Sequence, residues 1–154
     1  MVKLLKTEGD VVAGTYRFKQ DEVKYMSCIY VGRSKRPVVR GDGCMKADRV
    51  PAGFLKVTMD AVERFAEAYP RLVSYKADIP TVHLFDHGVW RGHFWGEDYR
   101  FSMRWRAIGG KIWLIPDLDL DHNDRVREDG TWKVYRGNFH EFMLRQPGGA
   151  LEGK

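Results

Sequence analysis

Two adjacent carboxylates, Glu97 and Asp98, separate an aromatic, glycine-containing segment from a stretch with helical periodicity. A carboxylate in the first turn of a helix is stabilised in its charged form by the helix dipole and by free backbone N–H groups. A carboxylate that is kept ionised and oriented can act as a general base. Acidic residues are also common at helix starts for stability alone, so the pair is compatible with a purely structural role.

Two tryptophans, Trp90 and Trp95, precede the carboxylates on an expected loop. Aromatic rings offer flat apolar faces that suit the CH faces of sugar rings, and they recur in ligand pockets. The alternative is that both rings pack beneath the loop as part of a core. The segment therefore indicates either a carbohydrate subsite or ordinary packing.

Four nearby residues, His83, Asp86, His87 and His93, raise the possibility of a zinc hydrolase. A His-x₃-His spacing on a loop lacks the helical geometry that aligns two imidazoles on one metal ion, and no third ligand motif follows. We therefore expect these histidines to be exposed or hydrogen-bonded.

A literal Asp-x-Asp occurs at Asp117 and Asp119, and again at Asp119 and Asp121, directly before His122. The three aspartates alternate along an expected strand. Alternating charges are typical of an exposed strand that is protected against pairing with other chains. We interpret them as an exposed edge face.

The elements that must position these residues are predicted from hydrophobic periodicity and turn residues. In one helix Val62, Phe65 and Tyr69 form an apolar stripe, with Asp60 and Glu63 as a capping box at its start and Pro70 at its end. The polar, glycine-bearing stretch up to about residue 50 is expected to form a hairpin or a mobile loop, and a loop is expected between the two helices. The predicted strands are 11–18, 27–31, 54–58 and 111–115, and the predicted helices are 60–69 and 97–108.

The second helix carries Phe101, Trp105 and Ile108 on one face, and Gly109–Gly110 closes it as glycine does at a helix C-terminus. The order strand, helix, loop, helix, strand predicts an α/β fold with a mixed sheet and flanking helices. No G-x-G-x-x-G or P-loop motif is present, and the chain opens in what reads as a helix tail, Val2 to Thr7.

Composition places the chain among ordinary globular proteins: it has 154 residues, 44% apolar and 31% charged. There is no uncharged apolar run long enough for a membrane span, and no secretory signal is evident. Cys28 and Cys44 are too few for a disulfide framework, which favours a reducing, cytoplasmic setting. The net charge of +5 is only weakly clustered, at Arg33 to Arg40, so nucleic-acid binding is disfavoured.

Residues 96–113 read Gly-Glu-Asp-Tyr-Arg-Phe-Ser-Met-Arg-Trp-Arg-Ala-Ile-Gly-Gly-Lys-Ile-Trp, followed by Pro116, Leu120 and His122. This block closely resembles the ending of bacterial and phage glycosyltransferases of the family-2-like, GT-A type. Residues 10–16, 52–55 and 135–138 match weaker motifs of the same family in the same order. The resemblance covers roughly residues 4 to 140 and is specific in the middle block.

The resemblance implies a partial GT-A fold, similar to nucleotide-diphospho-sugar transferases. Residues 1–145 would form its carboxy-terminal part, with the first βα units missing, and residues 146–154 a flexible tail. The Asp-x-Asp that normally precedes the first matched strand has no counterpart here. Pro51 replaces a glycine of the family, and Gly96 replaces a serine that would cap the helix.

The activity implied by the resemblance is an inverting, metal-dependent transfer of a sugar from a nucleotide sugar to an acceptor hydroxyl. Asp98, with Glu97 beside it, occupies the position of the catalytic base, and His122 that of a ligand to Mn²⁺ or Mg²⁺. The same comparison assigns substrate binding to Gly53, Phe54, Trp90, Trp95, Gly96 and Arg104.

The incomplete match leaves the activity of the isolated chain open. We expect weak or no transfer unless an amino-terminal half or a second copy of the chain completes the site. The alternatives are a truncated, non-catalytic remnant or carbohydrate-binding module, and a small basic protein that binds nucleic acid.

Overall fold

The computed structural model describes residues 2–33, 35–90 and 92–146, without the side chain of Trp90. The expected tail, residues 146–154, lies outside this part except for Gln146. Its centre is a five-stranded sheet in the order β2-β3-β9-β1-β4. The strands are β1 (Val11–Ala13), β2 (Cys28–Ile29), β3 (Met45–Arg49), β4 (Leu55–Val57) and β9 (Ile112–Leu114).

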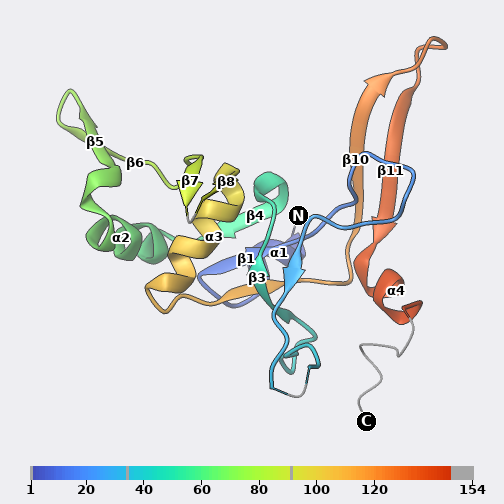
Figure 1. The fold of residues 1–154 in the computed structure, drawn as a ribbon, viewed down its shortest axis with the longest axis horizontal. Helices are drawn as coiled ribbons and strands as arrows, with labels where there is room; N and C mark the ends of the chain where they lie inside the picture. Colours follow the sequence, from blue (N-terminus) through green and yellow to red (C-terminus); the bar gives the residue numbers. More distant parts are fainter. Residues whose placement is uncertain (1, 34, 91, 147–154) are drawn as a thin grey trace.

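The sheet is mixed, because β1 pairs parallel to β9 whereas β1–β4, β3–β9 and β2–β3 are antiparallel. Around it lie helices and three two-stranded hairpins (Figure 1). This confirms the expected mixed α/β architecture with flanking helices. The helices are α1 (Val2–Lys6), α2 (Met59–Ala68), α3 (Glu97–Ala107) and α4 (Phe139–Leu144), and the short 3₁₀ turns are Ala52–Phe54 and Pro70–Leu72.

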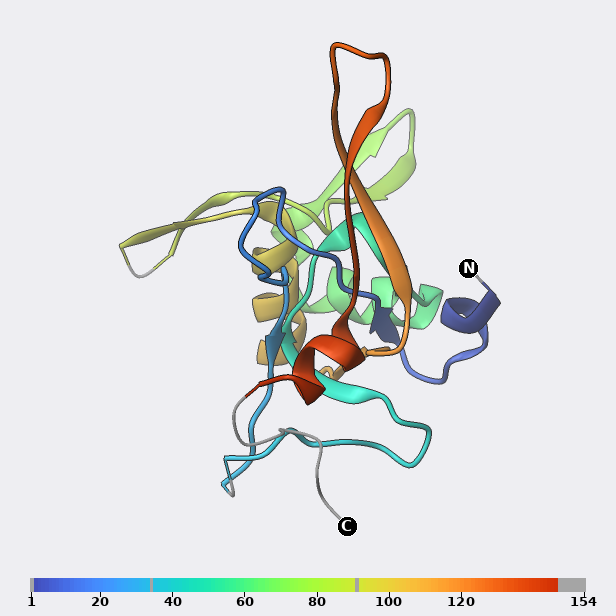
Figure 2. The ribbon, with the colours of Figure 1, turned by 90° about the vertical axis from the view of Figure 1, so that its right-hand side faces the viewer.

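The hairpins lie outside the central sheet, and the β10–β11 hairpin projects furthest from the body in both views (Figures 1 and 2). The stretch between α2 and α3 was expected to be a loop, yet it holds two of the hairpins; of the third, only a strand that carries the aspartates before His122 was predicted. Extended segments without strong periodicity pair locally here, which hydrophobic pattern alone does not reveal. The hairpins are β5 (Val73–Lys76) with β6 (Ile79–Val82), β7 (Gly88–Trp90) with β8 (His93–Trp95), and β10 (Asp119–Val126) with β11 (Trp132–Asn138).

Strand β1 forms the middle of the core, and all three of its residues are fully buried. Side chains alternate between the two faces of a strand, so Val11 and Ala13 join one apolar cluster while Val12 joins another. The larger cluster holds Phe65 of α2 together with Phe101 of α3. The sheet is therefore covered by α2 and α3 on one face and by smaller apolar groups on the other.

Helix α2 begins with a different cap from the one predicted. The side chain of Thr58 accepts a hydrogen bond from the backbone N–H of Ala61, so Thr58 is the N-cap and Asp60 lies inside the first turn. The predicted pairing of Asp60 with Glu63 as a capping box is wrong, because the helix starts one residue earlier. The predicted end holds, since α2 stops at Ala68, just before Tyr69 and Pro70.

Several strand limits also differ from the prediction. The 11–18 strand is regular only over Val11–Ala13, and the 54–58 strand begins with a 3₁₀ turn over Ala52–Phe54. The polar stretch up to residue 50, expected to be a hairpin or a mobile loop, contains β3, which pairs antiparallel with β2 as in a hairpin. The alternate residues Met45 and Ala47 of β3 are buried, whereas Lys46 and Asp48 are polar.

The end of α3 is fixed by two glycines, as predicted. Gly109 has a φ of +84°, a left-handed conformation that glycine adopts without strain, and the Gly110 N–H bonds to the Trp105 carbonyl at 2.9 Å. A side chain at Gly110 would run into the indole of Trp105, which is fully buried and donates its Nε1–H to the Lys111 carbonyl at 3.1 Å. No helix in the described part of the chain is long and apolar enough to cross a membrane.

Gly110→Ala therefore tests how closely Gly110 packs against Trp105 at the end of α3. The added methyl group cannot fit against Trp105 without moving a buried ring, and overpacking of this kind costs about 1–3 kcal/mol. We expect a lower free energy of unfolding in urea. Gly41→Ala is the matched control, since a Cβ there meets nothing within 4 Å, and its unfolding should match the wild type. Equal stability of both variants would contradict this packing.

Candidate functional site

Buried polar contacts fix the start of α3 against the neighbouring loops. Ser102 is fully buried; its hydroxyl donates to the Asp98 carbonyl at 3.0 Å and accepts from the Val50 N–H at 3.3 Å. The Tyr99 hydroxyl donates to the Met26 carbonyl at 3.2 Å. These bonds tie the first turn of α3 to the segments that follow β3 and precede β2.

Asp98 lies in that first turn and is half-buried. Its carboxylate accepts the backbone N–H of Tyr99 at 2.8 Å and that of Ala52 from the neighbouring 3₁₀ turn. Gly96 provides no side-chain cap, as its replacement of serine predicted, so Asp98 itself satisfies a free N–H of the helix start.

The pKa of Asp98 is raised above its ordinary value because burial disfavours the charged form. The two N–H donors oppose this effect, and the adjacent Glu97 adds to it. From the sequence, the helix dipole and free N–H groups were expected to favour the charged form of Asp98. That expectation is wrong, because the loss of water around the carboxylate outweighs the favourable N–H groups. A raised pKa brings the carboxylate closer to the value at which a general base works well near neutral pH.

Tyr16 joins the two residues that the resemblance marks as base and metal ligand. Its ring meets the ring of His122 edge-on, with centroids 4.7 Å apart. Its hydroxyl oxygen accepts the Gly53 N–H, and the charge of Asp98 contributes to raising the Tyr16 pKa, after the larger effect of burial. Ala52 and Gly53 are adjacent in the 3₁₀ turn and donate to Asp98 and to Tyr16, respectively, which places these two side chains at the same turn. We call Asp98, Tyr16 and His122 the Asp98–His122 cluster.

Gly53 matters for this cluster because any side chain there would collide with the Tyr16 hydroxyl. Phe54 lies beside the cluster rather than in it: its carbonyl accepts the Gly14 N–H at 2.9 Å, and its side chain packs against the apolar group that contains Val12 of β1. Gly53 therefore leaves room for the Tyr16 hydroxyl, and Phe54 supports the segment that follows β1.

His122 is oriented by the backbone of Arg17. Its Nδ1 lies 2.7 Å from the Arg17 carbonyl oxygen, which can only accept, so Nδ1 carries the proton and Nε2 is left with its lone pair. Such an arrangement is common for metal-bound histidines. Among the described residues, however, no group of three or more His, Cys, Asp and Glu side chains is placed to hold a metal ion. His122 fits a single ligand position, and the described residues do not complete a metal shell.

Glu97 and Trp95 lie at the outer side of the same helix start. Glu97 is exposed and its carboxylate lies 3.9 Å from Nδ1 of His87. Trp95 is partly buried, and the guanidinium of Arg49 lies 5.2 Å from the centre of its ring and 4.9 Å from that of Tyr99. Trp95 and Glu97 are neighbours of Asp98 in the sequence. The side chain of Trp90 lies outside the described part.

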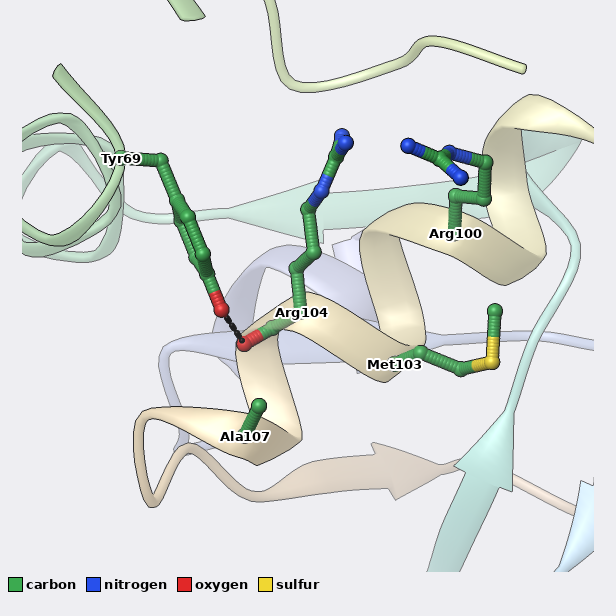
Figure 3. Close-up of a pocket in the computed structure, with 5 residues that line it drawn as sticks. All are labelled: Tyr69, Arg100, Met103, Arg104 and Ala107. Carbon is green, nitrogen blue, oxygen red and sulfur yellow. Dashed lines mark hydrogen bonds between the residues drawn. The ribbon is translucent and has the colours of Figure 1, made fainter. Parts of the chain in front are cut away.

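Arg104, assigned to substrate binding by the resemblance, is not part of the Asp98–His122 cluster. Its guanidinium pairs with the carboxylate of Asp86, with Nη2 at 3.1 Å from Oδ2, and Arg100 shares the same carboxylate. The Arg104 carbonyl accepts the hydroxyl of Tyr69 at 3.0 Å (Figure 3).

The other polar residues considered in the sequence have structural or exposed positions. Asp117, Asp119 and Asp121 are exposed, as predicted, and the last forms a two-bond pair with Arg136 at 2.7 and 2.8 Å. His83 hydrogen-bonds to the Ser74 hydroxyl at 2.7 Å. Both cysteines are free thiols.

Sequence reasoning did not single out Tyr16 or Ser102 as site residues. Tyr16 follows the buried β1 strand and Ser102 lies on the buried face of α3, next to Phe101. A serine among apolar residues on the core face of a helix is the available signal, because a buried hydroxyl requires partners.

Comparison of the chain with protein-family models, with curated proteins and with solved structures finds no match.

The raised pKa of Asp98 predicts a pH-dependent effect of Asp98→Asn. Below the ordinary value of 3.8 the carboxyl is protonated in both folded and unfolded chains. As pH rises through the folded-state pKa, the buried group must ionise, and the folded state loses stability relative to the unfolded chain. At pH 7 the variant should therefore melt higher than the wild type, on the order of 2 °C.

The difference in melting temperature should shrink as the pH approaches 4. Glu67→Gln, at an exposed position of α2, is the control and should show no such trend. An Asp98→Asn protein that melts lower at pH 7 than at pH 4, relative to wild type, would contradict the assigned direction.

Proposed function

We propose that the chain is the carboxy-terminal part of a GT-A-type glycosyltransferase domain, with Asp98 as its catalytic base. The observation that carries the proposal is that one 3₁₀ turn binds both Asp98, through the Ala52 N–H, and Tyr16, through the Gly53 N–H, and that Tyr16 in turn contacts His122. The family resemblance assigns Asp98 and His122 to one reaction centre, and their link through this turn and Tyr16 agrees with that assignment.

In the proposed reaction, the Asp98 carboxylate accepts the proton of an acceptor hydroxyl as that oxygen attacks the anomeric carbon of the donor sugar. A new carbon–oxygen bond forms on one face while the bond to the nucleotide diphosphate breaks on the other. The diphosphate leaves with the bonding electron pair, and the configuration inverts. The half-buried position of Asp98 and its two N–H donors keep the receiving oxygen in place.

Mn²⁺ or Mg²⁺, when bound, would neutralise the charge that builds on the leaving diphosphate. Within this chain only His122 is oriented as a ligand, so further ligands would have to come from the diphosphate or from protein groups beyond the described residues. The proposed role of His122 is to hold one position of that ion through Nε2.

Tyr16 supports the base without taking the proton from substrate. Its oxygen accepts the Gly53 N–H, which leaves its own proton able to donate toward Asp98 or a bound hydroxyl. Burial raises the pKa of Tyr16, so it stays protonated at neutral pH. We propose that it orients the acceptor hydroxyl beside Asp98.

A non-catalytic carbohydrate-binding module is the second candidate. It is favoured by the aspartates next to His122, which are engaged elsewhere: Asp117 and Asp119 with the Asn138 amide, and Asp121 with Arg136. In that case the Asp98–His122 cluster would bind sugar hydroxyls without transfer.

Calorimetric titration of the chain with UDP and GDP, with and without Mn²⁺, tests the proposed function. We expect binding that requires Mn²⁺ and weakens by about 10–100-fold in His122→Ala, the range seen when a metal site loses a supporting group. His140→Ala, on α4, is the control and should bind as the wild type. Absence of heat with both nucleotides, or equal binding by His122→Ala, would contradict the proposal.

Transfer separates the two candidates. Where the wild-type chain releases nucleotide from a sugar donor in the presence of acceptor, Asp98→Asn should slow release by about 10²–10⁴-fold, the usual contribution of a general base. Its nucleotide affinity should stay unchanged. Retained acceptor binding without any release by the wild type would favour the carbohydrate-binding module.

A further inference from the structure

The opposite side of α3 carries a groove that the proposed reaction does not use. The groove encloses about 320 Å³ and lies at the junction of α3 with the end of α2. Figure 3 shows Tyr69 beside Arg104, with the guanidinium groups of Arg100 and Arg104 on the same side of the helix. Its lining residues are Tyr69, Arg100, Met103, Arg104 and Ala107.

Helical geometry separates this groove from the Asp98–His122 cluster. Successive residues of an α-helix are rotated by about 100°, so Arg100, Arg104 and Ala107 lie about 180–240° around the axis from Asp98. Phe101 and Trp105, at about 300° and 340°, lie on the side of the helix nearest Asp98 and are buried in the core. The groove and the proposed catalytic base therefore face different surroundings.

The charges beside the groove do not balance. Arg100 and Arg104 share one carboxylate, that of Asp86, with Arg100 Nη2 at 3.3 Å and Arg104 Nη2 at 3.1 Å from its Oδ2. Neither arginine has another ion pair among the described residues. The side chains are only 14% and 21% exposed. One positive charge therefore remains with limited access to water, where an added anion would gain most.

Apolar surface forms the rest of the groove. The Tyr69 hydroxyl donates to the Arg104 carbonyl, which holds the phenol ring against α3, and the Arg104 guanidinium lies 5.9 Å from the centre of that ring. Met103 and Ala107 add further apolar surface. A concave, mostly apolar site of about 300 Å³ or more, with a few convergent polar groups, is typical of pockets for small organic ligands.

We propose that this groove binds a small organic anion, a carboxylate attached to an aromatic or aliphatic body. The carboxylate pairs with the guanidinium groups of Arg100 and Arg104, which suit its planar geometry, and the apolar body lies against Tyr69, Met103 and Ala107. Asp86 remains as the partner that holds both arginines in position. The proposal does not depend on Asp98 or on sugar transfer.

The test uses the full chain labelled with ¹⁵N and titrated with benzoate, which combines a carboxylate with an aromatic body. We expect saturable chemical-shift changes for the amides of Arg100 to Ala107 and of Tyr69. Benzyl alcohol, which lacks the charge, and inorganic phosphate, which lacks the apolar body, should each bind at least about tenfold more weakly, a difference of 1.4 kcal/mol.

Two variants examine the two halves of the site. Ala107→Phe places a ring in the groove while leaving both arginines, and its control is Ala68→Phe at an exposed position of α2. Arg104→Gln removes the excess charge, and its control is Arg125→Gln on the exposed hairpin β10–β11. Each groove variant should lose at least tenfold in benzoate affinity, and each control should bind as the wild type.

Three results would overturn the proposal: no saturable shifts with benzoate in the wild type, phosphate or benzyl alcohol binding as tightly as benzoate, or Ala107→Phe binding like the wild type. Arg104→Gln removes an ion pair with Asp86 and can loosen the loop that carries it. Ala107→Phe leaves that ion pair intact, so its loss of benzoate affinity reports on the groove alone. Loss of nucleotide binding elsewhere in the chain would leave the benzoate result unchanged.

Discussion

The docking of α3 onto the central sheet is the constraint on which the other features depend. Trp105 and Phe101 bury completely against β1 and α2, and Ser102 beside them uses its hydroxyl twice, once toward β3's end and once toward its own helix start. Because the buried face of α3 is fixed in this way, its first turn and its opposite face are fixed as well. Asp98 and the Arg100–Arg104 groove take their positions from this docking.

At the first turn, two physical effects on one carboxylate oppose each other. The N–H groups of Tyr99 and Ala52 favour the charged form of Asp98, while its partial burial and the charge of the adjacent Glu97 disfavour it, and burial prevails. A surface carboxylate that only decorated a helix start would show the reverse. The same half-buried position leaves the group reachable by a substrate, which a fully packed acid would not be. This balance is the physical basis for the proposed role of Asp98.

The sequence predicted the parts of the fold that local chemistry determines. The apolar stripes of α2 and α3, the Gly109–Gly110 end and the exposed aspartates of β10 all follow from spacing and residue type. It left the stretch that contains β3 open between a hairpin and a loop, because polar residues alternate with the buried ones there, and it did not predict the Thr58 cap. Tyr16 was missed because its role arises from tertiary contacts with Gly53 and His122, which no local pattern encodes.

The titration of the Asp98 carboxyl carbon, followed by ¹³C NMR in the intact chain, tests the central claim most directly. The account predicts a midpoint above the ordinary value of 3.8, because the folded chain removes this carboxylate from water. Glu97→Gln should lower that midpoint, because the charge of Glu97 raises the pKa of Asp98, whereas Glu67→Gln, at an exposed position of α2, should leave it unchanged. A midpoint at or below 3.8 that is insensitive to Glu97 would contradict the central claim.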